Sequence, residues 1–193
     1  MNKRSALETK KNILEAARAV FAEQGYAQAS MRHIARASGI SVGGLYLHFR
    51  NKEDLYLTFM QDWMKKLNDR TEEALLRIDD PIAAIRAFIT ISIDFARGNR
   101  EIIFLQGRGL GFTFGIERKR EFFRERRRLI ADIVRKGMVK GVFRDCDADE
   151  AAKVIFSILR GFIVSMVMDE EALFSAEAYA ELVLNGLIRR DNG

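Results

Sequence analysis

Residues 30–52 combine positive charge, hydroxyl groups and small side chains in a pattern that suits contact with a polyanion. The segment contains no Asp or Glu, and its basic residues are Arg32, Arg36, Arg50 and Lys52. Serine and tyrosine hydroxyls and two histidines lie between these bases. Such groups hold phosphate oxygens by charge and by hydrogen bonds, so duplex nucleic acid is the partner that the segment favours.

Two short helical patterns position these groups. Ser30 and Ser41 each stand where a serine hydroxyl caps the N-terminus of a helix. Between them, Gly39 tolerates the positive φ that a tight turn requires. The inward apolar positions are Ile34, Ala35, Leu45 and Phe49. Two short helices joined by a glycine turn predict a helix-turn-helix, which lays its second helix in the major groove of DNA.

Adjacent glycines, Gly43 and Gly44, lie inside the second helix, where each costs about 1 kcal/mol relative to alanine. Two interpretations stay open. The pair relieves a packing clash within the protein, or it leaves the backbone bare so that it can meet a nucleic-acid surface. The absence of acids nearby favours the second interpretation.

An earlier amphipathic helix completes a small three-helix core. Ser5 and Glu8 have the spacing of a capping box. Apolar residues follow at helical spacing, at Ile13, Ala16, Ala17, Val20 and Phe21. Gly25 ends this helix, and we expect Tyr26 to fold back over Phe21.

Charge is distributed unevenly along the chain. Residues 1–52 hold nine Lys or Arg and three acids, a net charge of +6, whereas the whole chain of 193 residues carries +5, which leaves −1 for residues 53–193. A basic head on a near-neutral body indicates a localised anionic partner. A membrane surface is the competing anion, but a membrane-bound helix needs an apolar face left over after folding, and the three-helix core uses that face.

Five segments stand in a fixed register: Ile13–Ala17, Phe21–Tyr26, Met31–Ala35, Ser38–Ser41 and Leu45–Leu55. This series resembles the N-terminal signature of the tetracycline-repressor (TetR) family of bacterial transcription regulators. The resemblance implies an all-α protein of about nine helices. It implies a three-helix DNA-binding head with a helix-turn-helix in residues 1–52, and a larger helical bundle for effector binding and dimerisation in residues 53–193.

The resemblance also implies which residues contact DNA. The expected set is Ser30, Arg32, Ser41, Val42, Gly43, Gly44, Tyr46, Leu47, His48 and Lys52. Within it, Tyr46, His48 and Lys52 would hold the phosphate backbone on either side of the major groove. Val42 and Gly44 stand where the family reads bases, and they offer only apolar contact or close backbone approach. Sequence-dependent DNA shape would therefore add to the specificity.

Caps and apolar periodicity predict helices throughout the body. A long helix follows Lys52, and Asp80–Pro81 begins the next one. The alternating charges of residues 117–128 predict a solvated helix, with a phosphate-gripping role as the alternative. Asp147 and Ser175 cap two apolar C-terminal helices.

Aromatic residues from several of these helices are candidates for lining an apolar effector cavity, although most aromatics at helical spacing belong to a core. The effector candidates are Trp63, Phe88, Phe95, Phe104, Phe112, Phe114, Phe162 and Met166. The two C-terminal helices predict a seam between two copies of the chain, with intramolecular packing as the alternative. The dimer candidates are Ser157, Gly161, Ser165, Tyr179, Leu182, Val183 and Gly186.

Two other classes of function stay open. Ile102–Leu105 before Gly107–Gly111 resembles a strand that leads into the phosphate-binding loop of a nucleotide-using enzyme. The glycine spacing does not match the dinucleotide fingerprint, and no second strand is predicted after it. A loop beside a ligand cavity and an ordinary connector are the other interpretations of this stretch. The second class is a helical adaptor that recognises protein alone.

The sequence offers little for catalysis or for metal binding. Cys146 is the single cysteine, and its acidic neighbours disfavour a thiolate. Two histidines, His33 and His48, give no metal site of ordinary spacing and no catalytic triad. No cofactor is expected. Because the sequence has no apolar run of about 20 residues and no signal-peptide pattern, we expect a cytoplasmic protein.

These observations predict a ligand-responsive, DNA-binding transcriptional regulator rather than an enzyme. The expected protein is a repressor that binds a palindromic operator as a homodimer and is released by a small, largely apolar effector. The effector mechanism follows from the resemblance, because the sequence itself contributes only the aromatics and the long connecting helix.

Overall fold

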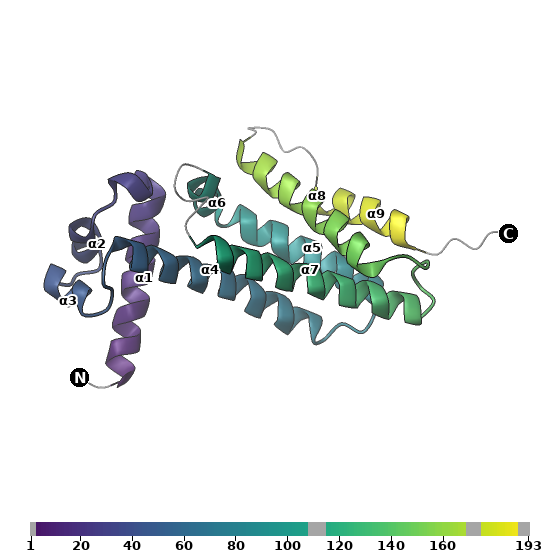
Figure 1. Cartoon of the computed structure of the whole chain (residues 1–193), viewed down its shortest axis with the longest axis horizontal. Coiled ribbons are helices and arrows are strands. Elements are labelled where there is room, and N and C mark those ends of the chain that lie inside the picture. The colour runs from purple at the N-terminus through teal and green to yellow at the C-terminus, as the bar shows by residue number, and fades with distance from the viewer. Residues whose placement is uncertain (1–2, 108–114, 169–174, 189–193) are drawn as a thin grey trace. The chain divides into compact units, whose positions relative to one another are not determined.

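A computed structural model describes residues 3–107, 115–168 and 175–188, which form nine helices (Figure 1). The helices are α1 (Lys3–Gln28), α2 (Met31–Ala37), α3 (Val42–Tyr46), α4 (Lys52–Leu75), α5 (Pro81–Arg97), α6 (Arg100–Gly107), α7 (Ile116–Val139), α8 (Ala148–Met168) and α9 (Ala176–Leu187). Across these ranges there is no strand beyond an isolated bridge between Phe143 and Ile188. The prediction of an all-α fold with about nine helices is confirmed.

The chain folds as two compact units. Unit 1 comprises residues 1–65 and 101–116, and unit 2 comprises residues 66–100 and 117–193. The long helix α4 begins in unit 1 and ends in unit 2. The domain boundary after residue 52 stays a prediction, because compactness does not test which residues contact DNA.

Unit 1 is built around the ring of Phe21. This ring packs edge-on against Tyr56, with 5.3 Å between the ring centroids, and it stacks with Tyr26 at 5.9 Å. Gly25 breaks the helical geometry of α1 with a φ of 74°, which lets Tyr26 fold back as predicted. Phe59 also lies beside Phe21, and the other buried residues of unit 1 include Ile13, Ala17, Ile34, Leu45, Phe49 and Leu55.

The helix starts follow the predicted caps in all but one case. At the start of α4, the backbone N–H of Asp54 donates to Asn51 Oδ1 at 2.8 Å, and the N–H of Arg50 donates to Asp54 Oδ2 at 3.0 Å. The caps at Asp80, Asp147 and Ser175 are confirmed as well. The capping box predicted at Ser5 is wrong, since α1 already begins at Lys3 and Ser5 lies within it.

Unit 2 packs α5, α7, α8 and α9 around a continuous apolar core (Figure 1). The hydroxyl of Tyr179 in α9 donates to the carbonyl of Ile155 in α8 at 2.5 Å, and the Tyr179 ring stacks with Phe162. On the surface, Arg86 of α5 forms ion pairs with Glu177 and Glu181 of α9. Helix α9 is therefore held to α8 by the contacts of Tyr179 and to α5 by ion pairs.

The segment Ile102–Leu105 is helical, within α6, and does not form a strand. The strand that a phosphate-binding loop at Gly107–Gly111 would require is therefore missing. Residues 108–114 of that glycine stretch lie outside the described residues. Within the described ranges, none of the helices combines the length and the apolar composition needed to cross a lipid bilayer.

A close approach between Gly137 in α7 and Phe143 yields a test of the unit 2 core. A Cβ atom at Gly137 would lie 2.0 Å from Phe143 Cδ2, so the ring has to move if alanine is introduced. We expect Gly137→Ala to lower the free energy of unfolding by about 1–3 kcal/mol, the usual cost of overpacking. Gly98→Ala is the control, because its Cβ would meet no atom closer than 3.6 Å. Equal urea midpoints for Gly137→Ala and the parent chain would contradict the packing described.

Candidate nucleic-acid interface

Serine hydroxyls fix the start of both short helices in unit 1. Ser30 Oγ accepts a hydrogen bond from the backbone N–H of His33 at 3.2 Å, which caps α2. Ser41 Oγ accepts from the backbone N–H of Gly44 at 3.0 Å, which caps α3. Between the helices, Gly39 adopts a φ of 71°, in the region that favours glycine. The helix-turn-helix geometry predicted from the sequence is therefore present.

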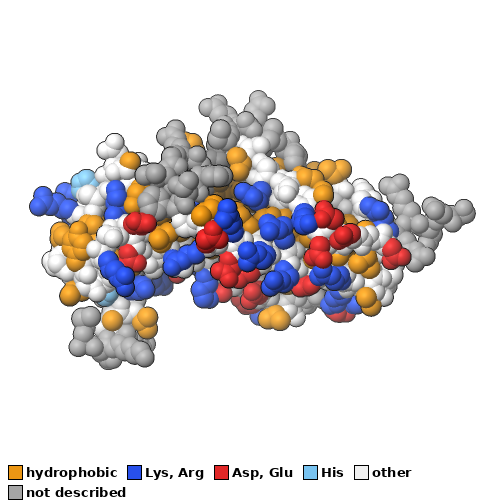
Figure 2. Space-filling model, viewed as in Figure 1, with side chains coloured by type: hydrophobic (Ala, Val, Ile, Leu, Met, Phe, Trp, Pro, Cys, Tyr) orange, Lys and Arg blue, Asp and Glu red, His pale blue; other side chains and the backbone are white. Residues whose placement is uncertain are grey.

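The outward face of α3 carries apolar and aromatic groups that no part of unit 1 covers. Val42 is 38% exposed, Tyr46 is 51% exposed and Leu47, which follows the helix, is 84% exposed. Figure 2 shows hydrophobic side chains on the surface at the end of unit 1 that holds α2 and α3. Leu45 points the other way and is fully buried. Leu45 thus anchors α3 to the core of unit 1, while Val42 and Tyr46 face the solvent.

Basic residues lie in the segments before and after α3. Arg32, Arg36 and Arg50 are exposed, and none of them forms an ion pair with a described residue. His48 is half-buried, and His33 Nδ1 lies 3.1 Å from Gln24 Oε1 in α1. The three arginines therefore keep their charge available for an anionic partner.

The two glycines of α3 differ in their surroundings. A Cβ at Gly44 would lie 3.2 Å from Ser41 Oγ, so a side chain there would press on the capping hydroxyl. A Cβ at Gly43 would meet nothing closer than the same oxygen at 4.0 Å. Packing within the protein accounts for the glycine at position 44. It gives no reason for the glycine at position 43, whose bare backbone faces outward.

Lys52 is engaged within unit 1. Its Nζ donates to three backbone carbonyls, those of Tyr26 at 2.7 Å, Ala29 at 2.9 Å and Ala27 at 3.2 Å. The same Nζ lies 4.5 Å from the centroid of the Tyr26 ring. An ammonium has three donors, and three carbonyls at the end of α1 accept from it. Lys52 therefore holds the segment between α1 and α2 against the start of α4, a role that the sequence pattern did not reveal.

The predicted effector residues are divided between the two units. Trp63 and Phe104 lie in unit 1, whereas unit 2 holds Phe88, Phe95, Phe162 and Met166. Phe88 and Phe162 are buried within the unit 2 core. Phe112 and Phe114 lie outside the described residues. A cavity shared by these eight residues therefore stays a prediction.

The predicted dimer residues fall on two sides of the C-terminal helices. Ser157 and Gly161 of α8 and Leu182 and Gly186 of α9 are exposed, and Leu182 is 68% exposed. Ser165 is half-buried. By contrast, Tyr179 and Val183 are buried in the unit 2 core of the single chain. In the structure of the single chain, Tyr179 and Val183 therefore pack within the molecule.

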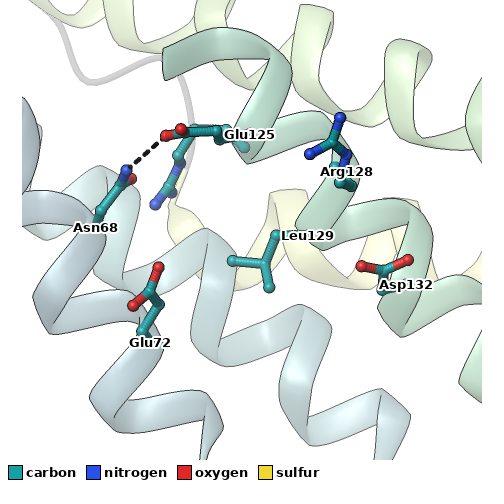
Figure 3. A pocket seen from close by; sticks show the side chains of 7 residues that line it. Asn68, Glu72, Glu125, Arg128, Leu129 and Asp132 are labelled. Carbon is teal, nitrogen blue, oxygen red and sulfur yellow. Dashed lines mark hydrogen bonds between the residues drawn. The ribbon is translucent and has the colours of Figure 1, made fainter. Parts of the chain in front are cut away.

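A pocket of about 170 Å³ lies within unit 2, between α4 and α7 (Figure 3). It is lined by Asn68, Glu72, Glu125, Arg126, Arg128, Leu129 and Asp132. The Asn68 amide donates to Glu125 Oε2 at 3.2 Å across it. Sequence reasoning missed Arg126, which is 2% exposed. The available signal was its position on the apolar stripe of α7, four residues after Phe122 and four before Ile130.

Comparison with known proteins connects this geometry to a family of regulators. Residues 13–58 match the family model described as bacterial regulatory proteins, tetR family. The chain is 39% identical over 61 residues to the fatty acid metabolism regulator protein of Bacillus subtilis, a match that covers 32% of this chain and 31% of that protein. The chain thus aligns with about a third of that relative's length.

Solved structures match nearly the whole chain. A TetR transcription regulator from Haloarcula marismortui superposes with a TM-score of 0.82 at 21% identity, over 94% of this chain and 99% of that one. FadR from Bacillus subtilis, solved in complex with stearoyl-CoA, gives a TM-score of 0.76 at 21% identity, over 91% and 98% of the two chains. At these identities, the similarity establishes a shared fold.

The three carbonyl contacts of Lys52 predict a stability effect. We expect Lys52→Met to lower the free energy of unfolding by about 1–3 kcal/mol, because three carbonyl acceptors, two of them in part-buried contacts, lose a charged donor. Lys11→Met is the matched control, since Lys11 is exposed on α1. The measurement is chemical denaturation of both variants beside the parent chain. If the two variants unfold at the same urea concentration as the parent, the bracing role of Lys52 is wrong.

Proposed function

We propose that this chain, which belongs to the TetR family of bacterial regulatory proteins, is a ligand-responsive DNA-binding regulator of transcription, acting as a repressor. It would bind a palindromic operator as a homodimer, with one helix-turn-helix at each half-site. A small, largely apolar effector would release it. Such a regulator acts where the bacterial DNA is, in the cytoplasm. We propose no catalytic role.

The observation that carries this proposal is the outward face of α3. The capped helix presents Val42, Gly43 and Tyr46 to solvent while Leu45 anchors it from behind. The surrounding segment, residues 30–52, has no acid and four bases. A helix-turn-helix places its second helix in the major groove, and flanking bases hold the phosphates. Both requirements are met by residues of unit 1.

The proposed contacts fall into two groups. Tyr46, His48, Ser30 and the exposed arginines would hold the phosphate backbone, as would Lys52 if a phosphate shares its ammonium with the three carbonyls. Base readout would come from Ser41, Val42, Gly43, Gly44 and Leu47, by apolar contact with thymine methyl groups and by close backbone approach. Arg32 has the length and charge for a base contact as well. DNA shape would supply the rest of the specificity.

Dimerisation is proposed through the exposed sides of α8 and α9. Apolar residues on these sides include Val154, Ile158, Val164 and Leu182. The small residues Gly161 and Gly186 leave open space, since a Cβ at either would meet no atom within 4 Å. Two such helices from each copy would bury the apolar groups in a four-helix seam. Tyr179 and Val183 support the seam from the core rather than contact the partner.

Effector control is proposed to act through unit 2 and α4. An effector that binds one conformation more tightly than another shifts the population toward it, and α4 is the helix that continues from the effector-binding unit into the DNA-binding unit. The structural relative solved with stearoyl-CoA is a precedent for a ligand with a long apolar part. The aromatic residues predicted from the sequence are the candidates for contact with it.

The experiment that tests the function is selection of bound fragments from random duplex DNA by the purified full chain. We expect enrichment of an inverted repeat whose half-sites lie about one helical turn apart. Fluorescence anisotropy with the selected duplex should show affinity that falls steeply with salt. A helical adaptor for protein alone would enrich no sequence and show no salt-dependent affinity for duplex DNA.

Substitutions in α3 should separate DNA binding from folding. Gly43→Ala should leave the fold intact, because the site has room for a Cβ, yet weaken operator binding by about tenfold or more, since each good contact is worth about 1–3 kcal/mol. Tyr46→Ala should weaken binding to a similar extent. Leu76→Ala, a control at an exposed apolar residue of unit 2, should bind as the parent does. Unchanged operator affinity in both α3 variants would remove α3 from the interface.

The seam between α8 and α9 of two copies should be sensitive to charge. The double change Ile158→Glu and Leu182→Glu should convert a dimer to a monomer, because burying a carboxylate without a partner costs several kcal/mol. Val139→Glu is the control, since Val139 is 90% exposed at the end of α7. Sedimentation equilibrium measures the outcome. A double variant that remains dimeric would place the seam elsewhere.

A further inference from the structure

Arg126 brings a positive charge into the interior of unit 2. Its side chain leaves α7 between α4 and α5, where Nη1 donates to Thr71 Oγ1 at 2.8 Å and Nη2 donates to Ser92 Oγ at 2.5 Å. The guanidinium carbon lies 4.2 Å from the centroid of the Phe88 ring. The residue is 2% exposed. Three helices therefore converge on one buried cation.

The groups around Arg126 solvate its charge without neutralising it. Thr71 Oγ1 donates its own proton to the carbonyl of Leu67 at 2.8 Å, and Ser92 Oγ donates to the carbonyl of Phe88 at 2.6 Å. Both hydroxyls are thus turned so that a lone pair accepts from the guanidinium. No carboxylate of a described residue forms an ion pair with Arg126. A guanidinium has five N–H donors, and the hydrogen bonds to these two hydroxyls use two of them.

Such a charge is unusual in a protein interior. Buried charges are normally paired with an opposite charge, because loss of water around an isolated ion is costly. Burial lowers the pKa of Arg126 to about 10, so the group is still positively charged at neutral pH. The fold therefore maintains an uncompensated cation, which is the arrangement expected where the counter-ion arrives with a ligand.

The pocket beside Arg126 supplies a place for that ligand. Arg126 lines the pocket of about 170 Å³. Leu129 and Asn68, labelled in Figure 3, line it as well. The acidic residues that also line it, Glu72, Glu125 and Asp132, are exposed. Charges in water are screened, whereas a buried cation is not. The repulsion between these exposed acids and an anion in the pocket is therefore weaker than the attraction between the anion and Arg126.

We propose that Arg126 binds the carboxylate of a small effector with an apolar body in unit 2. This inference rests on the proposed ligand-responsive function and makes its effector an organic acid rather than a wholly apolar molecule. A planar monoanion matches the fork of a guanidinium and forms two parallel hydrogen bonds with it. A phosphate, with up to two negative charges and a larger hydration shell, is disfavoured by the three acids around the opening.

The test compares acids with alcohols of the same chain length on the full chain. Butyrate, hexanoate and octanoate are titrated against butanol, hexanol and octanol, and thermal unfolding and isothermal titration calorimetry follow binding. Inorganic phosphate is a further arm. The variants are Arg126→Met, which removes the charge with little change in volume, and Arg126→Lys, which keeps the charge. Arg128→Met, at an exposed residue that also lines the pocket, is the matched control.

We expect at least one carboxylate to bind the parent chain about tenfold or more tightly than its alcohol, the range given by a charged hydrogen bond. Arg126→Met should lose this preference, Arg126→Lys should keep part of it, and Arg128→Met should keep most of it. Because Arg126→Met could fold poorly, a second readout uses the parent chain. The guanidinium ¹⁵N resonance assigned by its absence from Arg126→Lys should shift when the acid is added.

Other results would overturn the inference. Equal affinity for acids and alcohols would contradict it, and so would an Arg126 resonance that does not shift. A third contradicting result is a rise in the unfolding temperature with inorganic phosphate but with none of the carboxylates. The proposed function is tested separately, by operator binding without any acid. If the chain binds an operator but shows no preference for acids, the proposed function stands and the carboxylate site is rejected. If it binds acids but has no affinity for duplex DNA, the carboxylate site stands and the proposed function is rejected.

Discussion

The structure of unit 1 depends on contacts that hold the five-residue helix α3 in place. α3 is too short to be stable by its own hydrogen bonds, and glycine occupies two of its five positions. Ser41 caps its first turn, the fully buried Leu45 fixes its inward side, and the aromatic cluster around Phe21 supports the helices next to it. Rigidity supplied by neighbours leaves the outward backbone of Gly43 free to approach another molecule.

Much of this arrangement is visible in the sequence because it is local. Caps such as Ser41 and Asp80 are set by residues a few positions apart, and the turn at Gly39 needs only a residue that tolerates positive φ. The capping box at Ser5 failed because helix boundaries depend weakly on one serine, and α1 extends past it to Lys3. The strand-like run Ile102–Leu105 became a helix for a related reason, since a short apolar run fits either element.

The parts that sequence reasoning missed depend on contacts between distant residues. Lys52 bonds to carbonyls more than twenty positions earlier, and a backbone acceptor leaves no mark in the sequence. Arg126 meets Thr71 and Ser92 from two other helices, and neither partner is acidic, so no charge pattern pointed to them. The spacing of Tyr179 predicts an interface residue, because it suits a helix face. The structure adds that its hydroxyl donates to the carbonyl of Ile155 in the core of the same chain.

The two units thus use basic side chains in opposite ways. In unit 1, exposed arginines lie on the segments before and after α3, where water screens their charge. In unit 2, one arginine is stripped of water and surrounded by hydroxyls and an aromatic ring. The first arrangement suits a large partner held by many weak contacts, and the second suits a small ligand held by a few strong ones.

Hydrogen–deuterium exchange of the full chain, with and without a selected duplex at low ionic strength, tests the central claim most directly. The account predicts slower exchange of the backbone amides of residues 41–47, with smaller changes at the start of α2. Exchange in α3 that is the same with and without bound duplex, or a chain that binds no duplex at all, would contradict it.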